Sequence, residues 1–157
     1  AIPRALDKAE RYRLLNQPWA AESICLDILQ ADSGNQRALR VLLLARADQF
    51  GADSGGLVTR AREALQLLTG SYERAYYAGI ICERRAKAQM ENRAPGAGFI
   101  AYESVREAME FYERAEQLRP AGNDDAILRW NTCARLLNES PHVVPRGVER
   151  NEPAIGE

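Results

Sequence analysis

The chain contains one histidine, few strand-forming residues and no long hydrophobic run. With His142 as its single imidazole, the sequence excludes a histidine-based catalytic triad and a metal site built from several histidines. Its three cysteines, Cys25, Cys82 and Cys133, are widely spaced and form no CxxC motif, so we predict buried free thiols rather than a disulfide framework or a zinc site. No apolar run approaches the ~18 residues that cross a bilayer, and we therefore expect no membrane span.

The charges of the chain nearly cancel. The 21 Lys and Arg residues stand against 22 Asp and Glu residues, which gives a net charge of -1. A nucleic-acid binder usually has a strongly basic balance, and that balance is absent here. Nucleic acid is therefore not expected as the main partner.

Helix-forming residues dominate the composition. The chain has 25 Ala and 17 Leu but only 6 Val and 3 Thr, which favours helices over strands and predicts an all-α fold. Its 157 residues fit one helical domain over 1–140, followed by an extended or disordered tail over 141–157 that contains three prolines. The seven predicted helices span residues 4–15, 18–30, 36–50, 56–68, 72–93, 99–119 and 124–138.

A repeated spacing of small residues is the most specific pattern in the chain. It is clearest within the helix predicted at 99–119, where small residues allow close helix packing and a proline prevents further helix. This A-x3-Y-x2-A-x4-P spacing consists of Ala108, Tyr112, Ala115 and Pro120. It resembles the second helix of a tetratricopeptide repeat. The preceding helix carries the family's first-helix spacing at Ala75, Ala78, Gly79 and Cys82, with smaller side chains than usual at Ala75 and Cys82.

The resemblance extends over residues 2–138 and implies a right-handed superhelix of three helix pairs plus a closing helix. In the third pair, 26 residues separate Cys82 from Ala108, whereas 9 separate Tyr12 from Ala21 in the first. We therefore predict that both helices of the third pair are elongated. The alternative is a generic antiparallel helical bundle.

The resemblance also implies a ligand site, because the first helix of each pair faces a concave groove in this family. Arg37 and Arg40 lie three residues apart on one helix face, where their guanidinium groups suit a carboxylate or an acidic peptide segment. Tyr76 and Leu44 suit apolar side chains of the same ligand. The alternative is a solvated face in which Glu73 offsets the arginines. The predicted groove residues are Glu10, Arg13, Arg37, Arg40, Leu44, Glu73, Tyr76, Ile80, Glu83, Arg84, Ile127, Asn131 and Arg135.

The elongated third pair predicts a protruding hairpin over residues 86–103. Pro95 and Gly96 interrupt the helical pattern at its tip. Four apolar residues suit contact with a partner or with a second copy of the chain, or else pack on each other or on the tail. These residues are Met90, Phe99, Ile100 and Tyr102.

The sequence therefore predicts a non-enzymatic interaction module that binds a peptide or protein segment in its groove, with no cofactor and no metal. One alternative is a structural or oligomerisation module that uses the hairpin. Another is a helical enzyme that uses carboxylates, which would require two carboxyl groups within about 10 Å of each other in a deep pocket.

Overall fold

A computed structural model describes residues 1–51, 55–92 and 94–147, and this part of the chain contains seven α-helices and no strand. The predicted all-α class is confirmed, and the helix ends differ from the predicted ends by at most three residues. The helices are α1 (Ile2–Leu14), α2 (Pro18–Ala31), α3 (Gln36–Ala47), α4 (Gly55–Gln66), α5 (Ser71–Glu91), α6 (Ala97–Leu118) and α7 (Asp125–Glu139).

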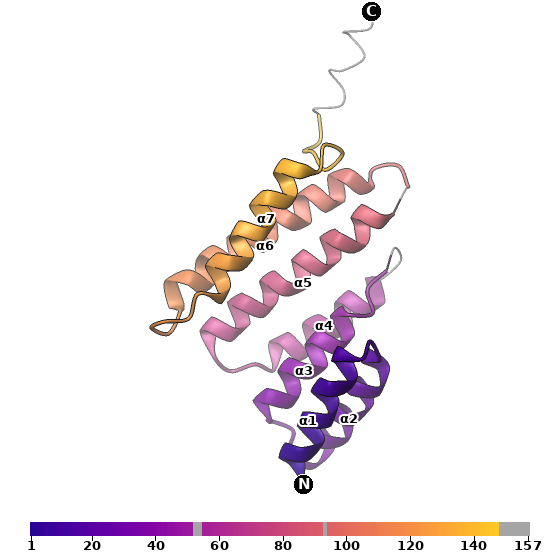
Figure 1. Cartoon of the computed structure of the whole chain (residues 1–157), viewed down its shortest axis with the longest axis vertical. Helices are drawn as coiled ribbons and strands as arrows, with labels where there is room; N and C mark the ends of the chain where they lie inside the picture. Colours follow the sequence, from indigo (N-terminus) through magenta and orange to yellow (C-terminus); the bar gives the residue numbers. More distant parts are fainter. Residues whose placement is uncertain (52–54, 93, 148–157) are drawn as a thin grey trace, which may run out of the picture.

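The helices follow one another along the long axis of the molecule, from α1 and α2 at one end to α7 at the other (Figure 1). Each helix packs against the next one in the chain, and α3 also contacts α1 and α5. The two longest helices, α5 and α6, pack against each other most extensively. Among the helices described here, none is both long enough and apolar enough to traverse a bilayer.

Local sequence signals account for several helix ends. Pro18 occupies the first turn of α2, where its missing N–H costs nothing. Asn35 caps α3, because its side-chain oxygen accepts a hydrogen bond from the backbone N–H of Ala38 at 2.9 Å. Gly96 turns the chain between α5 and α6 with a φ of 83°, a conformation that glycine adopts without steric cost.

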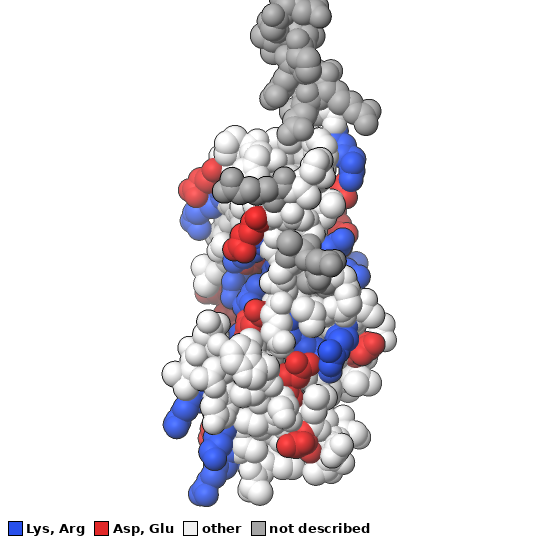
Figure 2. Space-filling view, turned by 90° about the vertical axis from the view of Figure 1, so that its right-hand side faces the viewer, with Lys and Arg blue, Asp and Glu red and all other residues white. Residues whose placement is uncertain are grey.

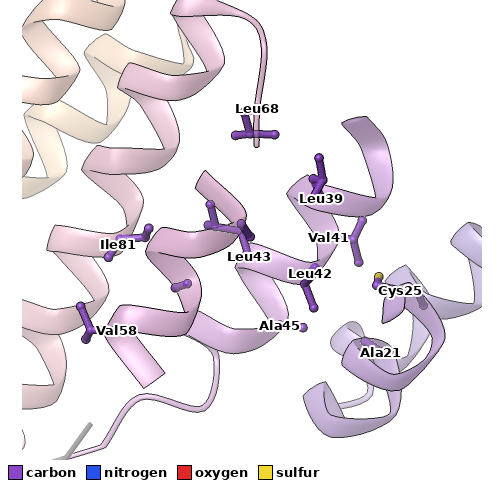
Figure 3. Packing of buried hydrophobic residues seen from close by; sticks show 13 residues of the cluster. Ala21, Cys25, Leu39, Val41, Leu42, Leu43, Ala45, Val58, Leu68 and Ile81 are labelled. Atoms are coloured by element: carbon purple, nitrogen blue, oxygen red, sulfur yellow. The ribbon is translucent and has the colours of Figure 1, made fainter. Parts of the chain in front are cut away.

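The first part of the core is centred on α3. Leu39, Leu42 and Leu43 are almost completely buried in a cluster that reaches from α1 to α5. Figure 3 shows the side chains of α3 in the middle of this cluster, with Cys25 of α2 on one side and Ile81 of α5 on the other. Burial of these leucines fixes α3 between its neighbours.

The second part of the core joins α5, α6 and α7, and Tyr112 of α6 is its largest fully buried side chain. Gly79 allows α5 to approach this ring, because a Cβ atom at position 79 would lie 2.5 Å from a ring carbon of Tyr112. Ala108 and Ala115 are both fully buried on α6. The small residues identified in the sequence therefore lie where helices meet.

The segment after α7 returns to the beginning of α6. Val143 is buried, and the backbone carbonyl of His142 lies against Gly98. The Arg146 guanidinium pairs with Glu103 at 3.2 Å and lies over the Phe99 ring at 5.4 Å. Residues 141–147 of the predicted tail thus contact the hairpin, and residues 148–157 lie outside the described residues.

The close approach of α5 and α6 gives a stability prediction. Gly79→Ala should lower the free energy of unfolding by about 1–3 kcal/mol, because the added methyl group would collide with the Tyr112 ring. The matched control is Gly56→Ala in α4, where an added Cβ meets nothing within 4 Å. This control should stabilise the protein by about 0.5–1 kcal/mol. Urea unfolding measures both, and equal effects at the two positions would contradict the packing described here.

Candidate functional site

The predicted groove residues lie on α1, α3, α5 and α7, which the resemblance predicts to be first helices of pairs, and we call the surface predicted for these four helices the first-helix face. Several of its charged residues are already paired. The Arg37 guanidinium donates hydrogen bonds to Asp7 at 2.8 Å and to Glu10 at 2.9 Å. Arg37 and Glu10 therefore join α3 to α1.

Asp48, the C-cap residue of α3, joins three of these helices. It accepts hydrogen bonds at 2.6 Å from Arg13 of α1 and from Arg84 of α5. The helix dipole disfavours a carboxylate at a helix C-terminus, and the two guanidinium groups offset that cost. Burial alone would raise the pKa of Asp48, but the hydrogen bonds from both arginines hold this pKa below its ordinary value.

Glu83 of α5 is a buried carboxylate, with only 1% of its surface exposed. It accepts a hydrogen bond from the Tyr112 hydroxyl at 2.8 Å and pairs with Lys87 at 2.9 Å and with Arg129 of α7 at 3.5 Å. Burial alone would raise the pKa of Glu83, yet Lys87, Tyr112 and Arg129 together lower it. The sequence assigned Glu83 to a ligand groove, whereas the structure places it inside the contact between α5, α6 and α7.

A third ionic cluster lies away from the first-helix face and was missed in the sequence. Arg46 of α3 is 7% exposed and pairs with Glu22 of α2 at 2.9 Å. Its guanidinium also donates to the backbone carbonyl of Arg60 in α4 at 2.8 Å. An arginine inside the apolar run of α3 was the signal that could have revealed this contact, because a buried arginine requires partners.

The unpaired part of the first-helix face is centred on Arg40. Of the five arginines predicted to line the groove, three form ion pairs, whereas Arg40 and Arg135 have no carboxylate partner within the residues described. Arg40 is half-buried, and its charge acts on the hydroxyl of Tyr77, whose pKa is raised by burial. Leu44 lies one turn further along the same side of α3 and is partly exposed. We call Arg40, Leu44 and Tyr77 the Arg40 patch.

The remaining predicted groove residues have different surroundings. Tyr76 belongs to a ring cluster, with ring centroids 5.8 Å from Tyr72 and 5.1 Å from Tyr77. Ile80 is buried, and the Glu73 carboxylate lies against Gly70 at the start of its own helix. Three others are on α7 and are partly or largely exposed: Ile127, Asn131 and Arg135. Ile127 lines an open hollow of about 400 Å³ between α6 and α7.

Two adjoining hollows of about 380 and 290 Å³ form a groove between α4 and α6. Ala78 of α5 lines both hollows, Leu65 lines them from α4, and Phe111 lines them from α6. We call this the α4–α6 groove. It was not predicted from the sequence, because the family resemblance implies a binding site only on the first-helix face. The small residues of α5 were the available signal, since they leave space between larger neighbours.

Among the described residues, no group of His, Cys, Asp and Glu side chains is arranged to hold a metal ion. The three thiols are free and buried, which confirms that prediction. Burial raises the pKa of Cys25 to about 11 and the pKa values of Cys82 and Cys133 to about 12. Thiols with such pKa values carry little thiolate near neutral pH and are weak nucleophiles.

Acidic and basic side chains are interspersed over the face of the molecule seen in Figure 2, so no broad field of one sign covers that face.

Comparisons of the chain with protein-family models, with curated proteins and with solved structures give no match.

The Glu83 cluster gives a pH-dependent prediction. Glu83→Gln should lower the free energy of unfolding by roughly 1.5–3 kcal/mol near pH 7, because Lys87 and Arg129 lose their anionic partner. A lowered folded-state pKa stabilises the protein above the unfolded value of about 4.3 and stops doing so as the pH falls through the folded value. The difference between variant and wild type should therefore shrink as the pH falls below that unfolded value.

Urea unfolding near pH 7 and at successively lower pH values below about 4.3 measures this difference. Glu110→Gln, at an exposed position on α6, is the control and should change stability by no more than about 0.5 kcal/mol. A Glu83→Gln penalty that is absent near pH 7, or that does not shrink as the pH falls below about 4.3, would show that the carboxylate does not stabilise this contact.

Proposed function

We propose that the chain is a non-enzymatic interaction module whose first-helix face binds a peptide or protein segment at the Arg40 patch. The observation that carries this proposal is the half-buried residue Arg40, which has no carboxylate partner in the described structure and lies beside Tyr77 and Leu44. An aspartate, a glutamate or a C-terminal carboxylate of the ligand would pair with Arg40 through two parallel hydrogen bonds. A neighbouring apolar side chain of the ligand would contact Leu44 and Tyr77.

The arrangement that we propose for the helices is a right-handed stack of three tetratricopeptide-like pairs with α7 as the closing helix. Three observations support it: neighbouring helices pack in chain order, α3 contacts both α1 and α5, and α5 approaches α6 closely at Gly79. In such a stack the first helices would line one continuous surface. The ion pairs at Arg37 and Asp48 would hold these helices at a fixed spacing around the Arg40 patch.

The two alternatives receive less support. In the hairpin at 86–103, Phe99 and Gly98 are contacted by residues 142–146, which reduces the surface free for a second copy. For a carboxylate enzyme, Glu113 and Glu116 line one hollow, but Glu113 accepts a hydrogen bond from Trp130 and Glu116 pairs with an arginine.

Substitution of Arg40 tests the proposal. Affinity capture from a lysate of the source organism, quantified by mass spectrometry, should yield partners that bind wild type and are depleted about tenfold or more with Arg40→Glu. Arg40→Lys should give an intermediate loss, because lysine keeps the charge but not the planar fork. Arg11→Glu, at an exposed position on α1, is the matched charge control and should capture the same partners as wild type.

The Arg40 variants should retain wild-type stability within about 0.5 kcal/mol, since Arg40 forms no ion pair within the described chain. Capture of the same partners at the same level by Arg40→Glu would contradict the assignment of the Arg40 patch as the binding site.

A further inference from the structure

The α4–α6 groove and the Arg40 patch share no residue. Ala75, Ala78 and Cys82 line the groove and recur at helical spacing, whereas Tyr77, the residue of α5 in the Arg40 patch, does not line it. The groove is therefore separate from the surface in the proposed function, and substitutions can test the two surfaces independently.

Short side chains on α5 explain why the groove is open. Ala75 and Ala78 form its floor, whereas Leu65 of α4 and Phe111 of α6 rise on either side. In addition, α4 packs more closely against α3 than against α5. The result is a channel along α5 with an apolar floor, of the kind that holds a helix in other protein complexes.

The groove is rimmed by arginines that form no ion pair within the described part of the chain. Arg74 and Arg114 line one hollow and Arg62 lines the other, and all three are exposed. The Arg114 guanidinium lies over the Phe111 ring at 5.9 Å. Glu107 is the single carboxylate among the lining residues, and it accepts a weak hydrogen bond from the Cys82 thiol at 3.5 Å. The rim therefore carries an excess of positive charge.

Leu118 of α6 adds an exposed apolar side chain to the lining of the groove, with 45% of its surface exposed. From Ser71 to Cys82 the groove follows α5 for about 16 Å, which equals about three turns of a helix. A bound helix of that length presents apolar anchors at positions i, i+4 and i+7.

We propose that the α4–α6 groove binds an amphipathic helix of a partner protein, with apolar anchors on Ala75, Ala78 and Phe111 and with acidic residues that pair with Arg62, Arg74 and Arg114. The apolar floor favours a ligand helix with apolar anchor residues, and the arginine rim favours carboxylates next to those anchors. Pairing with carboxylates from a partner removes the mutual repulsion of the rim and orients the helix along α5.

A selection experiment tests this proposal with a peptide library as the probe. A phage-displayed library of helical peptides of about 16 residues, with charge and apolarity randomised, is selected on the full chain. Peptides that also bind Arg74→Glu/Arg114→Glu are removed at each round. The enriched peptides should carry apolar residues at i, i+4 and i+7 with Asp or Glu beside them. Enrichment of neutral or basic peptides, or no enrichment, would overturn the proposal.

Fluorescence anisotropy with one enriched peptide then locates the site. Its Kd should weaken about tenfold or more with Arg74→Glu/Arg114→Glu and with Ala78→Leu, which fills the floor of the groove. The matched control, Arg4→Glu/Arg11→Glu, has the same net charge at exposed positions on α1 and should leave the Kd unchanged. Circular dichroism melting confirms that each variant is folded.

Three outcomes would contradict the proposal. The first is equal weakening by both arginine pairs, which would indicate nonspecific attraction. The second is displacement of the peptide by a single-stranded DNA or by phosphatidylserine vesicles as readily as by unlabelled peptide. The third is a dimer of the chain that Arg74→Glu/Arg114→Glu dissociates, which would assign the groove to a second copy. If Arg40→Glu weakens binding of the peptide and Arg74→Glu/Arg114→Glu does not, the peptide occupies the Arg40 patch instead of the groove. The failures of the two proposals are therefore distinguishable.

Discussion

Two carboxylates, Asp48 and Glu83, each bind cations from more than one helix, and the arrangement of α1, α3, α5 and α7 depends on them. Asp48 lies between Arg13 and Arg84, and Glu83 accepts contacts from α6 and α7 as well as from its own helix. Burial of leucines tolerates several rotations of one helix against the next. A hydrogen-bonded ion pair between two helices favours one rotation, because its geometry is directional. Removal of either carboxylate would leave partly buried cations without a partner.

These contacts also determine which side chains remain for a ligand. A guanidinium group that pairs with a carboxylate of a neighbouring helix has fewer free hydrogen-bond donors for a ligand. This applies to Arg13, Arg37 and Arg84. Arg40 and the arginine rim of the α4–α6 groove form no such pair in the described structure. Both of our binding proposals therefore concern positive charge that the fold itself does not use.

The sequence predicts the local part of this structure well. Abundant alanine and leucine, the prolines at 18 and 120, and the apolar periodicity place all seven helices, because these signals act over a few residues. The buried positions of Ala108 and Ala115 also follow from their spacing. The packing of one helix on the next is local in sequence as well, and so it is accessible to this kind of reasoning.

The sequence does not predict the charged contacts. The partners of Asp48 are 35 and 36 residues away, and the groove prediction treated Arg13 and Arg84 as independent ligand contacts. Glu83 shares a helix side with Tyr76, but the burial of its carboxylate depends on how α6 and α7 cover it. The α4–α6 groove exists because side chains from three helices leave a space unfilled, and a pattern within one helix does not reveal such a space.

A double-mutant cycle on Arg13→Met and Arg84→Met tests the central role of Asp48 most directly. In urea unfolding, the double variant should lose more stability than the two single variants combined, by about 0.5–3 kcal/mol, and this excess should vanish in an Asp48→Asn background. Additive losses in the wild-type background would contradict the account.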